Sequence, residues 1–269
     1  MKVLIIGGTG TLGQALVDEL LKHDVESIRI YARNEYKMWQ MRQKYGEPVD
    51  KLRYFIGDIR DNQRLNMAFE DVDIVFNCAA LKHVSLCNEN PFEALQTNSV
   101  GVQNALECAV QHNVKMFVQI STDKAINPVN LYGCTKAVSE YLVLDAPNWS
   151  GKAQTKFVVV RSGNIMASTG SCLEIWKRQH ENGEPLTVTD LEAERYMASK
   201  KDIANAIVDI ALNPSSGLYV LSMPKYKVKD LIQQFEGSKL NVVGLQHGEK
   251  LCEELYRDGE KFTLIEIPK

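Results

Sequence analysis

The stretch Lys2-Val-Leu-Ile-Ile-Gly7-Gly-Thr-Gly10-Thr-Leu-Gly13 decides the fold of this chain. Residues 2–6 are apolar and mostly β-branched, which predicts a short buried strand. Four glycines lie within residues 7–13, directly after this run, and a helical pattern carrying leucines on one face follows. Strand, glycine-rich turn and helix in this order are the context that a dinucleotide fingerprint requires. The spacing is G-x-x-G-x-x-G, and a glycine-rich turn without a ligand is the less favoured alternative.

Three of these glycines, at the positions of the G-x-x-G-x-x-G spacing, have separate tasks. Gly7 permits the tight turn, Gly10 lets the backbone approach a pyrophosphate, and Gly13 lets the helix pack closely. The helix N-terminus supplies free N–H groups and a positive dipole end for phosphates. The predicted cofactor contacts of this segment are Gly7, Thr9, Gly10, Thr11, Leu12 and Gly13.

The end of the second predicted strand, Ser27 to Ala32, indicates which nucleotide binds. A site for NAD would place an acidic residue here for the ribose 2′-hydroxyl. This chain has Arg33, followed by Lys37 one helical turn later. A guanidinium suits a 2′-phosphate, so we predict NADP, and the nearby Glu35 leaves NAD as a second interpretation.

The third and fourth predicted strands also end in candidate ligands. Asp58 and Ile59 follow the strand 52–56, where Asp58 either accepts from the adenine amine or simply caps a helix. The strand 74–77 leads into small residues that would let the backbone lie against the cofactor. The candidates after this strand are Ala79, Ala80, Lys82 and His83, and a solvated basic pair is the alternative for the last two. Asn98, in a predicted helix 91–112, is either a core amide or a ligand of the active-site loop.

The chemistry concentrates in Ser121-Thr-Asp-Lys124-Ala-Ile-Asn-Pro-Val-Asn-Leu-Tyr132-Gly-Cys-Thr-Lys136, after the buried strand 116–120. Ligands of open α/β sheets bind at the carboxyl ends of strands. Tyr132 and Lys136 are spaced i, i+4, so they share a helix face, and we expect the ammonium to lower the phenol's pKa. Such a tyrosine can remove an alcohol proton while hydride leaves the same carbon. A surface pair on an ordinary helix is the alternative.

The strands alternate with helices, which predicts an α/β, Rossmann-like doubly wound parallel sheet. The sixth strand is 156–161, and a helix 201–212 and a strand 217–221 extend the pattern. The remaining elements are short, with residues 192–197 irregular. We predict an NADP-binding domain of residues 1–162 plus 200–221, and a small discontinuous C-terminal substrate lobe of residues 163–199 plus 222–269.

Composition limits the class of protein. The chain has 269 residues, a net charge of −3 and six scattered cysteines without a C-x-x-C motif. Nothing here predicts nucleic-acid binding, a disulfide framework or a metal site. No apolar run is long enough for a membrane span, and the first strand starts at once, so we expect no signal peptide and a cytoplasmic location.

These motifs resemble the extended short-chain dehydrogenase/reductase superfamily, and within it the inverting UDP-N-acetylglucosamine 4,6-dehydratases of polysaccharide biosynthesis. The likeness runs from Gly7 to about Leu255. It rests on the segments 32–37, 80–84, 90–94, 121–136, 163–164 and 248–255. The Thr122-Asp123-Lys124 triplet is the most discriminating of them, because simple epimerases of this superfamily lack it.

The resemblance implies a mechanism. Tyr132 takes the C4 hydroxyl proton as hydride leaves C4, Lys124 removes the C5 proton, and Asp123 protonates the departing C6 hydroxyl. Hydride returns to C6, and C5 is reprotonated on the opposite face. Thr122 would hydrogen-bond the C4 oxygen, and Lys136 would hold the ribose. The proton transfers require a lowered ammonium pKa and a raised carboxyl pKa.

The resemblance also implies a UDP-linked sugar substrate and a homo-oligomer. Substrate contacts carried over by motif position are Lys82, His83, Lys124, Asn164, Arg195 and Glu253. The chain departs from the family at Cys252 (usually His), at Ser162 (usually Tyr) and at Thr169-Gly170-Ser171 (usually Arg-Gly-Ser). It is shorter in the last lobe and lacks the N-terminal transmembrane region of membrane-anchored relatives.

Two alternatives remain open. A 4-epimerase of the same fold would oxidise and re-reduce C4, but it would have no use for Asp123 and Lys124. A non-catalytic NADP-sensing protein would tend to lose the Tyr132–Lys136 pair, which this chain keeps.

Overall fold

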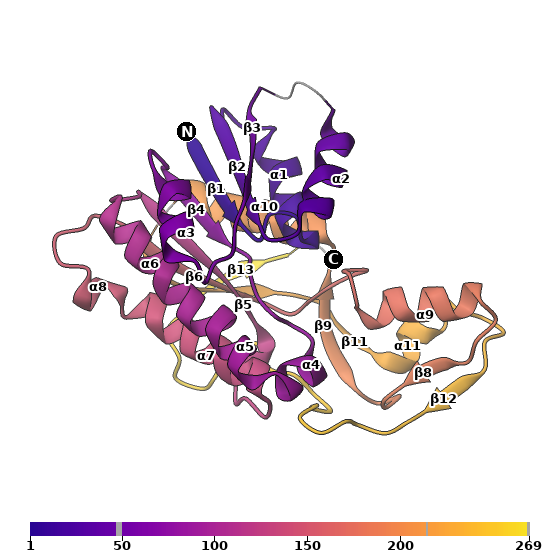
Figure 1. Cartoon of the computed structure of the whole chain (residues 1–269). Coiled ribbons are helices and arrows are strands. Elements are labelled where there is room, and N and C mark those ends of the chain that lie inside the picture. Colours follow the sequence, from indigo (N-terminus) through magenta and orange to yellow (C-terminus); the bar gives the residue numbers. More distant parts are fainter. Residues whose placement is uncertain (47–49, 214, 268–269) are drawn as a thin grey trace.

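Eight parallel strands form the main sheet, in the order β13-β10-β6-β5-β4-β1-β2-β3. The computed structural model describes residues 1–46, 50–213 and 215–267. The strands of this sheet are β1 (Lys2–Ile6), β2 (Ser27–Ala32), β3 (Leu52–Ile56), β4 (Ile74–Asn77), β5 (Met116–Thr122), β6 (Lys156–Ser162), β10 (Gly217–Ser222) and β13 (Thr263–Glu266). The order reverses between β1 and β4, which is the switch point of a doubly wound fold. The predicted fold class is confirmed (Figure 1).

Helices cover both faces of the sheet. Their bounds are α1 (Thr11–Leu20), α2 (Glu35–Tyr45), α3 (Asn62–Phe69), α4 (Val84–Glu89), α5 (Pro91–Leu95), the π-helix η1 (Gln96–Val100), α6 (Gly101–Gln111), the 3₁₀ turn η2 (Asp123–Ala125), α7 (Leu131–Leu144), α8 (Ala146–Trp149) and α10 (Lys200–Leu212). Helix α7 starts at Leu131, and the Asn130 side chain caps it. Tyr132 therefore lies in the first turn of this helix.

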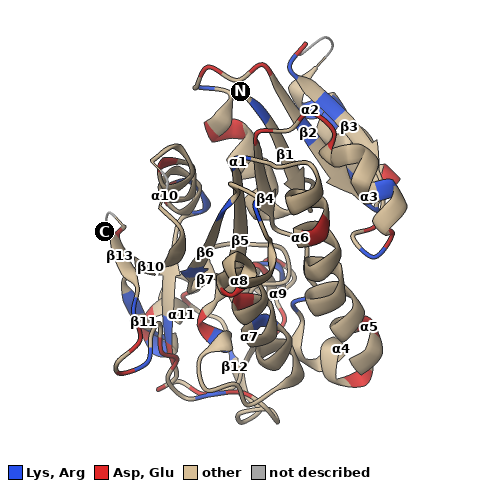
Figure 2. Cartoon of the chain, turned by 90° about the vertical axis from the view of Figure 1, so that its left-hand side faces the viewer, with Lys and Arg blue, Asp and Glu red and all other residues tan. Residues whose placement is uncertain are grey.

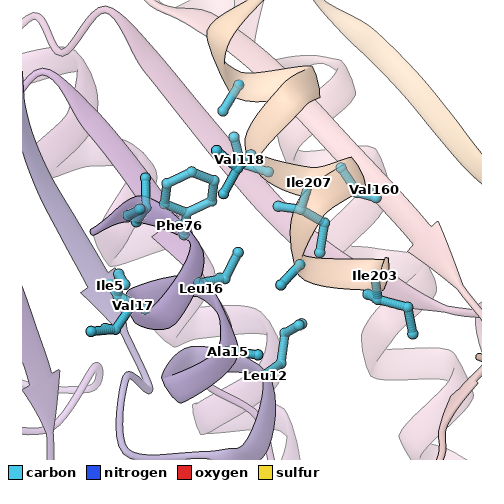
Figure 3. Close-up of a cluster of buried hydrophobic side chains, with 14 of the residues drawn as sticks. Ile5, Leu12, Ala15, Leu16, Val17, Phe76, Val118, Val160, Ile203 and Ile207 are labelled. Carbon is cyan, nitrogen blue, oxygen red and sulfur yellow. The ribbon is translucent and has the colours of Figure 1, made fainter. Parts of the chain in front are cut away.

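The two faces of the sheet carry separate hydrophobic cores because alternate residues of a strand point in opposite directions. In β1, Val3 and Ile5 pack with helices α1, α2 and α10, whereas Leu4 and Ile6 pack with α3 and α6. Figure 3 shows the first core, with Ile5 of the sheet beside Leu16 of α1. Burying each such side chain contributes roughly 1.5–3 kcal/mol, so both layers are held firmly.

The smaller lobe lies beside the carboxyl ends of β5 and β6 (Figure 1). Its elements are β7 (Asn164–Ile165), α9 (Cys172–Glu181), β8 (Leu186–Val188), β9 (Glu194–Ala198), β11 (Lys225–Lys227), α11 (Val228–Ile232) and β12 (Leu240–Val242). A third core, built around Trp176, holds them together. Strand β9 pairs with β7 and β11, so most of the segment expected to be irregular is a strand.

Strand β13 returns to the main sheet and pairs with β10. The sequence analysis placed residues 222–269 in the smaller lobe, but 263–266 belong to the edge of the sheet opposite β3 (Figure 2). Over the ranges 1–46, 50–213 and 215–267, no helix combines the length and the apolar character that a bilayer span needs.

Candidate active site

The glycine-rich turn after β1 has the shape that a dinucleotide requires. Gly7 has a φ of +80°, and a Cβ there would lie 2.7 Å from the Ala79 nitrogen. A Cβ on Gly13 would lie 2.6 Å from the Gly8 Cα. Gly10 is the N-cap of α1 and supplies no side-chain cap, so the N–H groups of the first helical turn are left without a side-chain acceptor from the cap residue. These features fit a pyrophosphate at the turn.

Two other predicted cofactor contacts of this turn, Leu12 and Thr9, have buried side chains. Leu12 is buried in the first core, so only its backbone can face a cofactor. Thr9 is also buried, and its carbonyl accepts a hydrogen bond from Gln14 Nε2 at 3.1 Å. Side-chain contact at Leu12 is therefore excluded by packing.

The loop after β7 lies over the turn. The Thr169 N–H donates to Thr11 Oγ1 at 3.3 Å, and Lys82 Nζ donates to the Thr169 carbonyl at 2.6 Å. A Cβ on Gly170 would lie 2.3 Å from the His83 ring. The structure thus brings Thr11, Lys82 and His83 together around one loop, which crosses from the glycine-rich turn to the loop after β4.

Arg33 and Asp58 meet at the ends of β2 and β3. Arg33 Nη1 lies 3.5 Å from Asp58 Oδ2, and the Arg33 side chain is half exposed. Asp58 also accepts from the backbone N–H and guanidinium of Arg60, while Asp61, not Asp58, caps α3. Lys37 is exposed, and its charge helps burial to lower the pKa of Lys82. A cationic corner therefore lies where a 2′-phosphate is expected.

The loop after β4 is held from behind by Asn98. Its amide accepts from the Leu81 N–H at 2.8 Å and donates to the Leu81 carbonyl and to Thr135 Oγ1. It thus joins this loop to α7. Ala79 and Ala80 stay partly exposed, with Ala79 against Gly7. The Ile59 side chain, by contrast, is buried in the second core, and the Ile59 carbonyl accepts a hydrogen bond from Asn104. The Ile59 side chain therefore cannot contact a cofactor.

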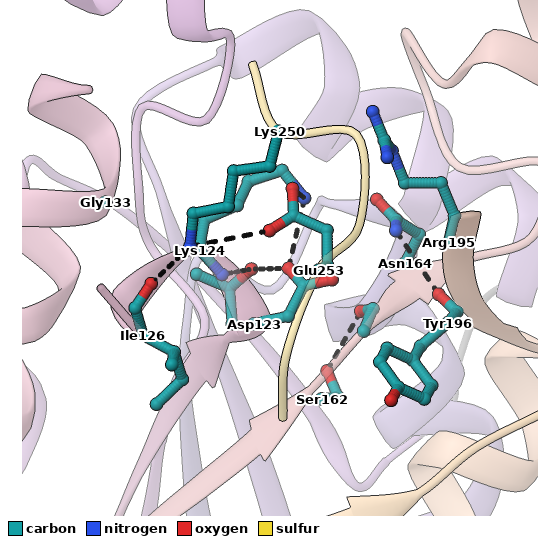
Figure 4. A network of polar contacts seen from close by, with 12 residues as sticks. Asp123, Lys124, Ile126, Gly133, Ser162, Asn164, Arg195, Tyr196, Lys250 and Glu253 are labelled. Carbon is teal, nitrogen blue, oxygen red and sulfur yellow. Dashed lines mark hydrogen bonds and ion pairs between the residues drawn. The ribbon is translucent and has the colours of Figure 1, made fainter. Parts of the chain in front are cut away.

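The triplet at the end of β5 forms a compact acid–base group (Figure 4). Asp123 is fully buried, and its Oδ1 accepts from Thr122 Oγ1 at 2.9 Å and from Lys124 Nζ at 3.0 Å. Gly133 makes this packing possible, because a Cβ there would lie 2.3 Å from the Lys124 carbonyl oxygen. Lys124 Nζ also lies 3.5 Å from Glu253 Oε1.

The charge state of Lys124 differs from the expectation. Burial lowers the pKa of Lys124, but the carboxylates of Asp123 and Glu253 outweigh it and raise the pKa well above its ordinary value. The lowered ammonium pKa that the implied mechanism requires is therefore absent in the free protein. Two anions beside this partly buried ammonium hold its proton in place.

Tyr132 and Lys136 also behave differently from the prediction. Burial raises the pKa of the Tyr132 phenol to about 12, and the ammonium that opposes the rise belongs to Lys124. Lys136 Nζ instead donates to the Ile120 carbonyl at 2.5 Å. Burial lowers the pKa of Lys136 to about 8. In the free protein Lys136 therefore does not lower the phenol's pKa.

The predicted sugar-nucleotide contacts on the smaller lobe face this group. Asn164 on β7 donates to the Tyr196 carbonyl at 3.2 Å, and Arg195 on β9 donates to the Leu251 carbonyl at 3.0 Å. Figure 4 shows both side chains on the opposite side of Glu253 from Lys124. Lys124 and Glu253 are thus in direct contact, and Asn164 and Arg195 lie beyond Glu253, while Lys82 and His83 lie at the loop that covers the glycine-rich turn.

One buried cluster was missed by the sequence analysis. Arg161, at the end of β6, donates to both oxygens of Glu140 on α7 and to both oxygens of Glu260. Glu140 also accepts from the hydroxyl of Ser121, which precedes the Thr122-Asp123-Lys124 triplet. A cation after the apolar run 157–160 was a usable signal, because a buried arginine needs anionic partners. Those partners could not be read from the sequence.

Within the part of the chain that the structure describes, no three His, Cys, Asp or Glu side chains come together as a metal site. The titratable side chains of Asp123, Lys124, Tyr132, Lys136 and Glu253 are a phenol, two ammonium groups and two carboxyl groups.

Comparisons with known proteins agree on the fold. Residues 3–269 match the family described as "Polysaccharide biosynthesis protein". The chain is 37% identical over 255 residues to the inverting UDP-N-acetylglucosamine 4,6-dehydratase of Campylobacter jejuni serotype O:2, covering 93% of this chain and 76% of that protein. It is 34% identical over 268 residues to the UDP-glucose 4-epimerase of Rickettsia bellii, covering 96% of this chain and 78% of that protein.

A solved structure is also similar. Pen from Bacillus thuringiensis superposes with a TM-score of 0.92 at 36% identity, covering 95% of this chain and 83% of that chain. The relatives thus share one architecture, but their names divide between a dehydratase and an epimerase.

Proposed function

The chain belongs to the polysaccharide biosynthesis family of short-chain dehydrogenase/reductases that act on nucleotide sugars, and we propose that it is an inverting UDP-N-acetylglucosamine 4,6-dehydratase. The observation that carries the proposal is the contact of 3.0 Å between Lys124 Nζ and Asp123 Oδ1 at the end of β5. Eliminating water across C5 and C6 requires a base that removes the C5 proton and an acid that protonates the C6 oxygen. This pair supplies both.

One proton shift prepares the pair. If the proton on Lys124 Nζ passes to Asp123 Oδ1, the result is a neutral amine and a carboxylic acid. The amine accepts the C5 proton, and the acid gives its proton to the C6 oxygen, which leaves as water. Both groups then return to the ion pair that the structure contains. The raised pKa of Lys124 is therefore compatible with a basic role, because the proton stays within the pair.

In the oxidation at C4 we assign Tyr132 as the base that takes the C4 hydroxyl proton. Thr122 hydrogen-bonds the C4 oxygen. The phenol must lose its proton before it can accept one, and the free protein holds it protonated. We propose that cofactor and substrate binding bring Lys136 into contact with the cofactor ribose and lower the phenol's pKa. A nicotinamide cofactor, when bound, takes hydride from C4 and returns it to C6. Arg33 and Lys37 favour NADP over NAD.

The decisive experiment is proton NMR of the protein with UDP-N-acetylglucosamine in deuterated water. Loss of the C6 methylene signals, a new methyl signal and deuterium at C5 are the expected result. A C4 epimer with an intact C6 would favour the epimerase reading, for which the Rickettsia relative is the supporting observation. An unchanged sugar across a panel of UDP- and dTDP-linked hexoses would overturn the proposal.

The cofactor is tested separately with Arg33→Ala. We expect NADP affinity to fall at least tenfold, because a charge-assisted hydrogen bond contributes about 1.5–3 kcal/mol, and NAD affinity to change little. Titration calorimetry with both cofactors measures the difference. Lys44→Ala, at the far end of α2, is the matched control. Equal losses for the two cofactors would remove the argument for NADP.

A further inference from the structure

Residues 246–260, which we call the C-terminal strap, are tied to the catalytic stretch 121–136. Their anchors to this stretch are the hydrogen bonds from Asn130 Nδ2 to the Gly248 carbonyl (2.7 Å), from Lys250 Nζ to the Ile126 carbonyl (2.5 Å), from Asn127 Nδ2 to Glu254 Oε2 (2.9 Å) and from Arg257 Nη2 to the Ala125 carbonyl (3.1 Å). The strap is therefore fixed against the loop that carries Asp123 and Lys124.

The smaller lobe holds the strap from the other side. The Leu251 carbonyl accepts from the Glu194 N–H at 2.8 Å and from Arg195 Nη1 at 3.0 Å. Glu253 lies between Leu251, which is tied to the smaller lobe, and Glu254, which is tied to the stretch 121–136. Its position is thus set by both parts of the molecule.

Glu253 faces the acid–base pair. Its side chain is almost fully buried, and Oε1 lies 3.5 Å from Lys124 Nζ. Oε2 has no hydrogen-bond partner among the residues that the structure describes, and Lys250 Nζ lies 4.0 Å from it. Figure 4 shows Glu253 close to both Lys124 and Lys250. A buried carboxylate with a free oxygen is costly, so its retention here calls for a role.

The groups that face Lys124 come from four elements. Asp123 lies on η2, Tyr132 on α7, Cys172 on α9 and Glu253 on the strap. Two carboxylates therefore surround one ammonium at short range. In a partly buried site, an opposite charge at this distance strongly favours the protonated amine.

We infer that Glu253 is a positioning residue for the Asp123–Lys124 pair, which it holds in place and whose single mobile proton it keeps bound. The inference rests on the proposed dehydratase function and deepens it. Glu253 neither gives nor takes a proton in the elimination. The proton moves from Lys124 Nζ to Asp123 Oδ1, and the substrate restores it. This role differs from direct sugar binding, which the family resemblance implies for this position.

The test is the pH profile of turnover for Glu253→Gln, which keeps the shape and removes the charge. Without the carboxylate the Asp123–Lys124 pair loses its proton at lower pH. The pH at which kcat declines on the alkaline side of the profile should therefore decrease by about one unit. At neutral pH we expect kcat to fall and KM to change less than threefold. Glu253→Asp should restore part of the shift.

Glu254→Gln is the matched control, because Glu254 anchors the same strap through Asn127 and does not contact Lys124. A merely structural role for Glu253 would lower kcat equally at every pH. A rise in KM with unchanged kcat and an unmoved limb would identify a sugar ligand instead. Either result would overturn the inference.

A second measurement does not depend on turnover. Lys124 retains 21% of its side-chain exposure, so a small amine reagent such as acetic anhydride can reach it. Peptide mass spectrometry should show labelling of Lys124 several-fold faster in Glu253→Gln, because a larger fraction of the amine is neutral, and unchanged labelling in Glu254→Gln. Equal rates in all three proteins would refute the role of Glu253, whereas absence of sugar turnover would refute the proposed function alone.

Discussion

Two buried clusters of this molecule each hold two carboxylates around one cation, yet they differ in how completely their atoms are paired. In the Arg161 cluster, the guanidinium donates to both oxygens of Glu140, to both oxygens of Glu260 and to the Leu255 carbonyl. In the Lys124 cluster, Asp123 Oδ2 and Glu253 Oε2 are buried without a hydrogen-bond partner among the described residues.

Both clusters lie at the carboxyl ends of neighbouring strands, and each takes one carboxylate from the C-terminal strap. Arg161 follows the apolar part of β6, and Lys124 follows β5. A fully paired network stabilises and rigidifies the fold, whereas a partly paired one is a site with hydrogen-bonding capacity left for a ligand. The first cluster therefore fixes α7, which carries Tyr132 and Lys136, and the second keeps two carboxylate oxygens without a protein partner among the described residues, as the proposed substrate site requires.

The largest effect is expected from Arg161→Met. It leaves Glu140 buried without its cation, which costs about 3–5 kcal/mol of unfolding free energy. Urea denaturation followed by circular dichroism measures the loss, with Arg178→Met on the exposed face of α9 as the control. A loss no larger than that of the control would contradict a stabilising role for this cluster.

Lys124→Met should separate activity from stability. We expect kcat to fall by about 100- to 10,000-fold, because the general base is gone, while nicotinamide cofactor affinity stays within a few-fold of the unchanged protein. The unfolding free energy should fall less than in Arg161→Met, because Lys124 donates one short hydrogen bond to its cluster and Arg161 donates five. Single-turnover kinetics and urea denaturation test this contrast, and normal turnover would eliminate Lys124 as the base.

The smallest effect concerns acid stability. Burial raises the pKa of Glu260, but Arg161 outweighs it, so the pKa lies below the ordinary value of 4.5. The Arg161–Glu260 pair makes its full contribution to the unfolding free energy above about pH 4.5. This contribution is lost as the pH falls through the lowered pKa that Glu260 has in the folded state. Glu260→Gln should therefore flatten the decline of the urea midpoint below about pH 4.5. An unchanged decline would show that other carboxylates dominate acid unfolding.

The backbone motifs were readable because they depend on local geometry. Gly7 needs a positive φ beside Ala79, and the strand–turn–helix order fixes where that turn lies. The spacing of Tyr132 and Lys136 was also local, and both residues lie on one helix. The spacing did not predict which groups the ammonium groups of Lys124 and Lys136 contact. Lys136 turns to the Ile120 carbonyl, and Lys124 is the ammonium whose charge lowers the phenol's pKa.

The sequence by itself determined the doubly wound sheet, the glycine-rich cradle and the residues of the catalytic stretch, because these follow from periodicity, backbone sterics and short spacings. The tertiary structure alone decided the charge states and the partners. It brought Glu253 to Lys124 and Glu260 to Arg161, and it returned β13 to the main sheet. These contacts join residues far apart in the chain, and the burial that sets each pKa exists only once the chain has folded around them.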